Sequence, residues 1–311
     1  MRSASSERRR PQVAVVVLNW NGADDTLACL ESLRASTAPP HVIVVDNGST
    51  DDSVTRIGAS GLADDVVRTG ANLGYAEGNN VGLRLALEHR FAVIAVLNND
   101  TIVEPDALEL LLEQLPASGH RAVSPEIRYF DRPGESWFAG GVVDRGWPRH
   151  LQPVELAGLE QSLRPSECLS GCCIVARRET WERVGFFDPG YFLIFEDSDW
   201  SMRAVRHGVA LYVVTASTIR HRVSSSFGRG PASPLGGYYF VRNGLRFEAR
   251  YFARYLPRFV VQWLVRPVPA LLRSGRGREL AFRWFGALAF AAGLRGRAPR
   301  VLERLAARCA V

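Results

Sequence analysis

Apolar runs of strand length alternate with helix-like segments along the first hundred residues of the chain. VAVVVLNW and FAVIAVLNND, for example, are rich in β-branched residues and have few polar ones. Strands that are apolar on both faces are typical of a parallel sheet covered by helices on both sides. The pattern therefore predicts an α/β fold. The expected strands are 13–20, 41–46, 65–68 and 91–100, and the expected helices are about 24–35, 52–60 and 78–89.

Polar residues stand at the carboxyl ends of three of these strands. Asn19 follows the first, Asp46 and Asn47 the second, and Asn98-Asn99-Asp100 the fourth. Such residues are also ordinary turn formers, so any one of them alone would favour a structural role. Ligands of open α/β sheets bind beyond the carboxyl ends of the strands. Three polar ends together therefore indicate a ligand site there.

The rest of the chain is less regular. Residues 124–165 are rich in Gly, Pro and Trp and are expected to form long loops, while CLSGCCIVARRETWERVG predicts a strand and a helix. A strand at 210–214, a loop containing His221 and a helical final seventy residues complete the predicted order. We expect a disordered tail at 1–11, a nucleotide-sugar-binding half at 12–123, an acceptor-binding and catalytic half at 124–230, and a helical, basic segment at 231–311.

An acidic cluster, Glu196-Asp197-Ser198-Asp199, follows the apolar run YFLIF at the start of a predicted helix. Partial burial raises the pKa of a carboxyl group and a nearby cation lowers it, which suits a general base. Asp and Ser at a helix start also cap free N–H groups. We expect Asp199 or Ser198 to cap the helix and Asp197 to carry chemistry.

Asp100 and His221 are the candidate metal ligands. A carboxylate fixed after a strand can hold Mg²⁺ or Mn²⁺ against a diphosphate, because these ions favour one or two carboxylates plus phosphate oxygens. His221 lies between Arg220 and Arg222, and three serines follow, so this stretch suits phosphate. An isolated His is more often structural than a ligand, so the residues alone leave the role of His221 open.

The motifs together resemble glycosyltransferase family 2, an inverting family, and within it the rhamnosyltransferase-like branch. The matching stretches are VVVLNWNG, VVDNGSTDDS, NLGYAEGNNVG, LNND, SGCCIVARRETWERVGFFDPGYFLIFEDSDW and HRVSSSFG, in the family's order. The resemblance implies a GT-A fold, with Asp197 as the catalytic base, Glu196 as its partner and Asp100 and His221 as metal ligands. It implies that Asp46 and Asn47 contact the nucleoside and that Asn98 and Asn99 belong to the metal motif. We expect the nucleotide-sugar site to consist of these four residues together with Leu18, Asn19, Asn72, Gly74, Asn79 and Arg222.

The reaction implied is a single displacement with inversion, assisted by a divalent cation, Mg²⁺ or Mn²⁺. The resemblance favours dTDP-rhamnose as donor, with UDP-sugars as the alternative, and a hydroxyl of a glycan, lipid-linked or small-molecule acceptor. Asn98 stands where the family's metal motif has its first acidic residue, which predicts a site with one carboxylate fewer. The competing hypotheses are a sugar-nucleotide pyrophosphorylase, which the complete absence of lysine disfavours, and a non-catalytic sugar-nucleotide-binding relative.

The formal net charge of +6 is unevenly distributed. From Arg242 to the end, 15 Arg stand against 3 Glu, or +12, so the preceding part carries about 6 − 12 = −6. Interleaved aromatic residues suggest that this segment lies on an anionic membrane surface. The alternatives are an ordinary helical subdomain or a basic homodimer face, and no motif supports nucleic-acid binding.

The five cysteines and the N-terminus bear on location. Cys168, Cys172 and Cys173 lack a second cluster that would complete a zinc site, so we interpret the cysteines as buried thiols in a reducing compartment. No apolar run at the N-terminus has the form of a secretion signal, and no uncharged apolar run reaches about 18 residues. We therefore expect a cytoplasmic protein, peripheral at the inner face of a membrane if the basic segment binds lipid.

Overall fold

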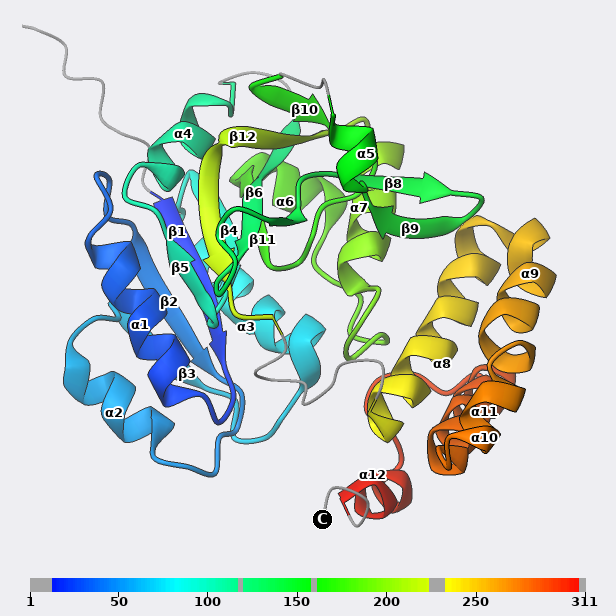
Figure 1. The fold of residues 1–311 in the computed structure, drawn as a ribbon. Helices are drawn as coiled ribbons and strands as arrows, with labels where there is room; N and C mark the ends of the chain where they lie inside the picture. The colour runs from blue at the N-terminus through cyan, green and yellow to red at the C-terminus, as the bar shows by residue number, and fades with distance from the viewer. Residues whose placement is uncertain (1–12, 117–119, 158–160, 224–232, 308–311) are drawn as a thin grey trace, which may run out of the picture.

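A ten-stranded sheet forms the centre of the structure, a computed structural model that describes residues 13–116, 120–157, 161–223 and 233–307 (Figure 1). Its strands are β1 (Val13–Asn19), β2 (His41–Asp46), β3 (Asp65–Arg68), β4 (Val93–Asn98), β5 (Thr101–Val103), β6 (Arg121–Tyr129), β7 (Ser136–Phe138), β10 (Leu163–Pro165), β11 (Cys173–Arg177) and β12 (Ala210–His221). The order is β10-β12-β6-β11-β4-β1-β2-β3, with β5 beside β12 and β7 beside β6. The β4-β1-β2-β3 part is parallel, whereas β11 runs antiparallel to both its neighbours. The mostly parallel α/β fold predicted from the sequence is confirmed.

Helices cover both faces of the sheet because successive strand residues point to opposite sides. Val15 and Val17 of β1 belong to one buried cluster, which includes residues of helices on that face; Ala14 and Val16 belong to the other. The first face carries α1 (Ala23–Arg34), α2 (Ser53–Ser60) and α4 (Ala107–Glu113). The second carries α3 (Gly74–Glu88), α6 (Arg178–Val184) and α7 (Glu196–Arg206).

Helix α3 packs very closely on the sheet, and glycine makes this approach feasible. A Cβ at Gly82 would overlap Val16 Cγ1 and lie 3.0 Å from Val45 Cγ2, and one at Gly78 would lie 2.6 Å from Leu18 Cδ1. At these two positions the absence of a side chain brings the helix against β1 and β2.

The prediction of long loops over 124–165 is wrong. Besides β6, β7 and β10, this region holds α5 (Pro153–Leu156) and the hairpin of β8 (Gly141–Asp144) and β9 (Trp147–His150). Strand β6 is central, and Pro125 within it argues against a central strand because proline lacks a backbone donor. The register of β12 shifts between Val214 and Thr218, opposite Pro125, so a bulge accommodates the proline. The expected boundary at residue 123 falls inside β6.

Three other expected boundaries also differ from the structure. Helix α3 begins at Gly74, four residues before the predicted start, and the strand expected at 91–100 ends at Asn98, with the short strand β5 after it. Strand β12 extends to His221, which was expected in a loop. These differences share a cause: strand pairing and helix packing between distant segments override weak local signals.

The C-terminal region is helical, as predicted, and lies to one side of the sheet (Figure 1). It comprises α8 (Pro234–Tyr251), η2 (Ala253–Tyr255), α9 (Leu256–Val260), η3 (Val261–Val265), α10 (Val268–Arg273), α11 (Gly277–Ala291) and α12 (Arg300–Ala307). Trp147 of the β9 hairpin packs against Phe195, Phe240 and Trp263, which joins this region to the sheet domain. Among the helices of the described residues, none combines the length and apolarity that a bilayer crossing demands. The expected tail at 1–11 lies outside the described residues.

We expect Gly82→Ala to lower the free energy of unfolding by about 1–3 kcal/mol, because the added methyl overpacks Val16 and Val45. This loss should outweigh the helix propensity of alanine, which favours it over glycine by about 1 kcal/mol. Gly58→Ala in α2 is the matched control, since a Cβ there meets nothing within 4 Å. Urea denaturation should show the control equal to or more stable than the parent; equal stability of the two variants would contradict the packing argument.

Candidate active site

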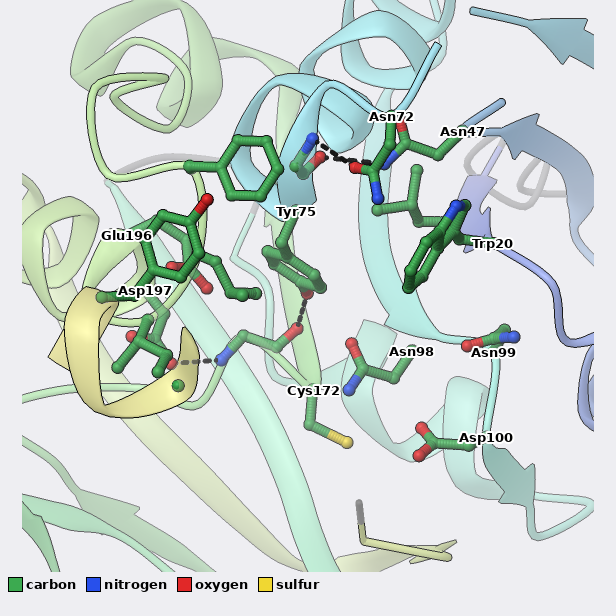
Figure 2. A pocket seen from close by; sticks show the side chains of 18 of the residues that line it. Trp20, Asn47, Asn72, Tyr75, Asn98, Asn99, Asp100, Cys172, Glu196 and Asp197 are labelled. Carbon is green, nitrogen blue, oxygen red and sulfur yellow. Dashed lines mark hydrogen bonds between the residues drawn. The ribbon is translucent and has the colours of Figure 1, made fainter. Parts of the chain in front are cut away.

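A cavity of about 660 Å³ opens at the carboxyl edge of the parallel strands (Figure 2). Ten of the fourteen residues expected from the sequence to form the site line it. They are Leu18, Asn47, Asn72, Gly74, Asn98, Asn99, Asp100, Glu196, Asp197 and His221. Residues from the C-terminal region also line the cavity, namely Tyr239, Arg297 and Glu303.

The sheet register brings the polar strand ends together. Leu18 of β1 lies beside Asn98 of β4, and Asn19 beside Asp46 of β2. In Figure 2, Asn98, Asn99 and Asp100 lie on one side of the view, and Glu196 and Asp197 lie on the other. The cavity thus has two chemically distinct sides.

Asp100 and His221 form a buried pair on the first side. His221 Nε2 lies 3.0 Å from Asp100 Oδ1, and the side chains are 6% and 5% exposed. The pairing of β5 with β12 explains this contact, because Thr101, the residue after Asp100, lies opposite His221. The ring of Trp137 packs edge-on against His221 with the centroids 4.8 Å apart, which fixes the imidazole.

The donor set on this side suits a divalent cation that a substrate helps to bind. Two ligand atoms 3.0 Å apart match neighbouring positions of a coordination sphere with bonds of about 2.1 Å. Asn98 Oδ1 is buried without a hydrogen-bond partner among the described residues, so a further oxygen is available. With one carboxylate and one imidazole, the remaining ligands would come from water and phosphate, as is usual for Mg²⁺.

Asp197 lies on the other side, at the start of α7, with two backbone donors directed at it. The N–H of Gly171 donates to Asp197 Oδ2 at 2.9 Å, and the N–H of Ser198 donates to Oδ1 at 2.6 Å. Tyr75 holds the same loop, because its hydroxyl donates to the carbonyl of Gly171 at 2.6 Å (Figure 2). Burial raises the pKa of Tyr75, so its hydroxyl remains a donor.

Glu196 is adjacent but has a different environment. Its side chain is buried, and Oε2 has no hydrogen-bond partner among the described residues. Burial first, and the charge of Asp197 second, raise the pKa of Glu196 well above its ordinary value. This environment therefore disfavours the charged form of Glu196.

The expectation that Asp199 or Ser198 caps this helix is wrong. The N-cap residue is Phe195, and no side chain caps the helix start. Asp199 is completely buried and instead forms ion pairs with Arg203 at 2.9 Å and Arg250 at 2.9 Å. Arg250 belongs to α8, so this carboxylate ties the acidic helix to the C-terminal region.

The turn that precedes Glu196 has an unusual backbone. Phe192, Ile194 and Phe195 have φ values of 61°, 65° and 77°, in the left-handed region. For residues other than glycine this conformation costs about 1–3 kcal/mol each. Such a turn persists only where the surrounding structure stabilises it.

Helix α8 supplies that stabilisation. The side-chain amide of Asn243 donates to the carbonyls of Tyr191, Leu193 and Ile194 at 2.8, 2.6 and 3.0 Å. Arg242 adds a hydrogen bond to the carbonyl of Tyr191 at 3.0 Å. Both side chains are buried, so these bonds are shielded from water. The C-terminal region therefore determines where Glu196 and Asp197 lie.

Four residues expected in the site do not line the cavity. Asn19 donates to Asp46 Oδ1 at 3.0 Å, so the two form a buried support beneath the strand ends. Asn79 is buried within α3 and donates to the carbonyl of Tyr75. Arg222 pairs with Asp25 at 2.6 Å, which directs its guanidinium to α1.

Several cavity residues were not identified from the sequence. Trp20 and Tyr75 occur within motifs that were recognised, but aromatic residues in such stretches are more often part of the core. Trp137 lies in the region interpreted as loops, and Arg297 lies in the helical C-terminal region. No local pattern links Arg297 to Asn72, whose carbonyl accepts a hydrogen bond from it at 3.4 Å.

We expect Asn243→Ala to lower the free energy of unfolding by at least about 1–3 kcal/mol, the cost of a buried polar group left without a partner. The carbonyls of Tyr191, Leu193 and Ile194 would all lose a donor. Gln262→Ala, at an exposed position of the same region, is the control and should change stability by less than about 0.5 kcal/mol. Denaturant unfolding curves that coincide for the two variants would refute the role of Asn243 in holding the turn.

Comparisons with known proteins find relatives of this chain. The family model described as "Glycosyl transferase family 2" matches residues 14–184. N-acetylglucosaminyl-diphospho-decaprenol L-rhamnosyltransferase of Mycobacterium tuberculosis is 32% identical over 254 residues, which cover 72% of this chain and 80% of that protein.

The four cysteines within the described residues are free and buried.

Two solved structures are similar in fold. GalNAc-T7 with UDP, GalNAc and Mn²⁺ superposes with a TM-score of 0.65 at 18% identity, over 89% of this chain and 55% of that one. The mannosyltransferase PcManGT of Pyrobaculum calidifontis with GDP-Man and Mn²⁺ superposes with a TM-score of 0.55 at 17% identity, over 97% and 81%. These likenesses show the GT-A fold. The chain belongs to glycosyltransferase family 2 and is a glycosyltransferase.

Proposed function

We propose that this enzyme transfers a sugar, with inversion, from a nucleoside diphosphate to an acceptor hydroxyl by a single displacement. The observation that carries the proposal is the cavity with Asp197 on one side and the Asp100–His221 pair on the other. One side suits a proton acceptor and the other suits a diphosphate with its cation. A single displacement needs these two functions on opposite faces of the anomeric carbon.

The donor that we favour is dTDP-rhamnose, because the rhamnosyl branch supplies the sequence resemblance and a relative at 32% identity is an L-rhamnosyltransferase. The acceptor that we favour is a sugar linked through diphosphate to a polyprenol, in the synthesis of a cell-wall or other polysaccharide, by analogy with that relative's substrate. UDP-sugars remain the alternative donors. A panel of dTDP-, UDP- and GDP-sugars distinguishes them by product formation.

In the proposed reaction the acceptor oxygen attacks the anomeric carbon as the bond from that carbon to the diphosphate oxygen breaks. Asp197 takes the acceptor proton, and the nucleoside diphosphate leaves with the bonding electrons. The N–H groups of Gly171 and Ser198 orient the carboxylate for this role. Burial disfavours the charged form of Glu196, which would limit repulsion beside the base.

A divalent cation, Mn²⁺ or Mg²⁺, would be held by Asp100 and His221, with Asn98 beside them. When bound, such an ion neutralises negative charge on a leaving diphosphate. The ion-free pairing of His221 with Asp100 keeps both side chains directed to one point. Asn47 and Asn72 shape the adjoining wall, because the side chain of Asn72 accepts from the N–H of Gly74 at 2.8 Å and that of Asn47 accepts from the N–H of Leu73 at 2.9 Å.

Asp197→Asn should fold normally and lose at least about a hundredfold in turnover, the lower range for general-base catalysis. The amide cannot accept the proton, although it retains the size of the carboxylate. Asp106→Asn is the matched control, because Asp106 is exposed and its side chain does not cap α4. Transfer from dTDP-rhamnose is measured with a lipid-linked N-acetylglucosamine acceptor, and near-normal turnover of Asp197→Asn would eliminate its assignment as the base.

Chelation with EDTA should abolish transfer, and Mn²⁺ or Mg²⁺ should restore it. His221→Ala should raise the Mn²⁺ concentration needed for half-maximal activity by more than about tenfold. Loss of a residue that only orients a metal ligand already costs about 10–100-fold in metal affinity, and His221 is proposed as a ligand itself. His207→Ala, at an exposed position after α7, is the control. Full activity in EDTA would refute the cation's role.

The C-terminal surface supports a second part of the proposal, association with an anionic membrane from the cytoplasmic side. Of the 13 large hydrophobic residues exposed among the described residues, 9 lie after residue 260. They are Val261, Val265, Leu272, Trp284, Phe285, Leu288, Leu294, Val301 and Leu305. Apolar and aromatic side chains beside a net charge of +12 suit the interface of a bilayer with anionic lipids. A lipid-linked acceptor would then reach the cavity from the membrane.

Liposome flotation tests this association. The enzyme should float with vesicles containing anionic lipid and remain behind with neutral ones, and Trp284→Ser combined with Leu288→Ser should reduce the floating fraction. Val154→Ser is the control, because Val154 is 81% exposed but lies on α5. Equal flotation of all variants would contradict the proposal, and a concentration-dependent dimer that the double variant dissociates would assign this face to a homodimer instead.

A further inference from the structure

Two histidines and an aspartate meet at the edge of the sheet opposite the cavity. His41 is the first residue of β2 and Asp65 the first of β3, while His89 caps the C-terminal end of α3. The cavity lies at the carboxyl ends of these parallel strands, so this cluster lies at their amino ends. Nothing in the transfer reaction uses it.

The donor atoms of the three side chains are close enough to share one ion. One atom from each residue lies within 4.8 Å of the others. His41 Nε2 is 2.6 Å from Asp65 Oδ2, and His89 Nδ1 is 4.0 Å from the same oxygen. In a zinc site with bonds of about 2.0–2.2 Å the ligands stand roughly 3.3 Å apart, so small side-chain rotations would suffice.

The neighbouring groups support the same interpretation. The other ring nitrogen of His41 faces Asp64 Oδ2 at 4.0 Å, the side on which a carboxylate orients a metal-binding histidine. Asp64 is itself fixed by Arg34 at 2.8 Å and by the N–H of Val42 at 2.7 Å. The ring of His41 packs on Phe91 with the centroids 4.8 Å apart.

We propose that His41, Asp65 and His89 form a second metal site, for a divalent transition metal of the Zn²⁺ class. Two imidazoles and one carboxylate suit Zn²⁺, whereas Mg²⁺ prefers oxygen ligands. The three side chains are 31%, 31% and 43% exposed, so the ion can enter from solvent and keep a water ligand. The bound ion links the edge strand β3 to β2 and to the end of α3, which makes its role structural.

The test is Zn²⁺ titration of the EDTA-stripped full chain, followed by calorimetry and by thermal unfolding. At a Zn²⁺ concentration about 100-fold above Kd, we expect the melting temperature to rise by about 5 °C. His89→Ala and Asp65→Asn should each lose this rise and weaken Zn²⁺ binding at least about tenfold. His207→Ala should retain both.

Asp100→Asn separates this site from the catalytic one, because it alters only the proposed catalytic cation site and should leave the melting shift in place. A shift that survives in His89→Ala, or that disappears in Asp100→Asn alone, overturns the proposal. The ion-free melting temperature of His89→Ala checks folding; if it falls, the more conservative His89→Gln replaces it. Failure here leaves the transfer reaction untouched, since activity is not the readout.

Discussion

The hydrogen bonds of Asn243 to the turn before α7 are the interaction on which the active-site geometry depends. Three residues of that turn adopt left-handed conformations that are unfavourable in isolation. The buried side-chain amide of Asn243, on α8, donates hydrogen bonds to three carbonyls of this turn, and Arg242 donates a fourth. The ion pair between Arg250 and Asp199 fixes the first turn of α7 from the same helix. The C-terminal region therefore holds in place the turn that carries Glu196 and Asp197 to the cavity.

The sheet provides the other half of the site through its register. Parallel pairing places the ends of β1, β2 and β4 at one edge, and the antiparallel β5–β12 contact brings His221 to Asp100. The close approach of α3, which Gly78 and Gly82 allow, sets the wall formed by Tyr75. The strand ends place polar side chains on one side of the cavity, and the turn before α7 places Glu196 and Asp197 on the other.

The two edges of the sheet differ in their ligand chemistry. At the carboxyl edge, one carboxylate and one imidazole leave room for phosphate oxygens, which suits an ion that arrives with a nucleotide. At the amino edge, two imidazoles and a carboxylate suit a resident ion of the zinc class. The difference in the preferred metal follows from the number of nitrogen donors, which is one imidazole at the carboxyl edge and two at the amino edge. Burial does not set it, since the Asp100–His221 pair, with the single imidazole, is the more buried of the two.

The alternating apolar runs and their polar ends determined the α/β class, the parallel half of the sheet and the edge of the sheet at which the cavity opens. They did so because a strand that is buried on both faces must be apolar along its whole length, and such a run is visible in the local sequence. The β6 strand escaped prediction because Pro125 is tolerated only through a bulge in β12, a partner some 90 residues away. The contact of His221 with Asp100, the pairing of Asp199 with arginines and the part played by Asn243 were likewise decided by tertiary structure. Each depends on segments that only the folded chain brings together, and no local pattern encodes that proximity.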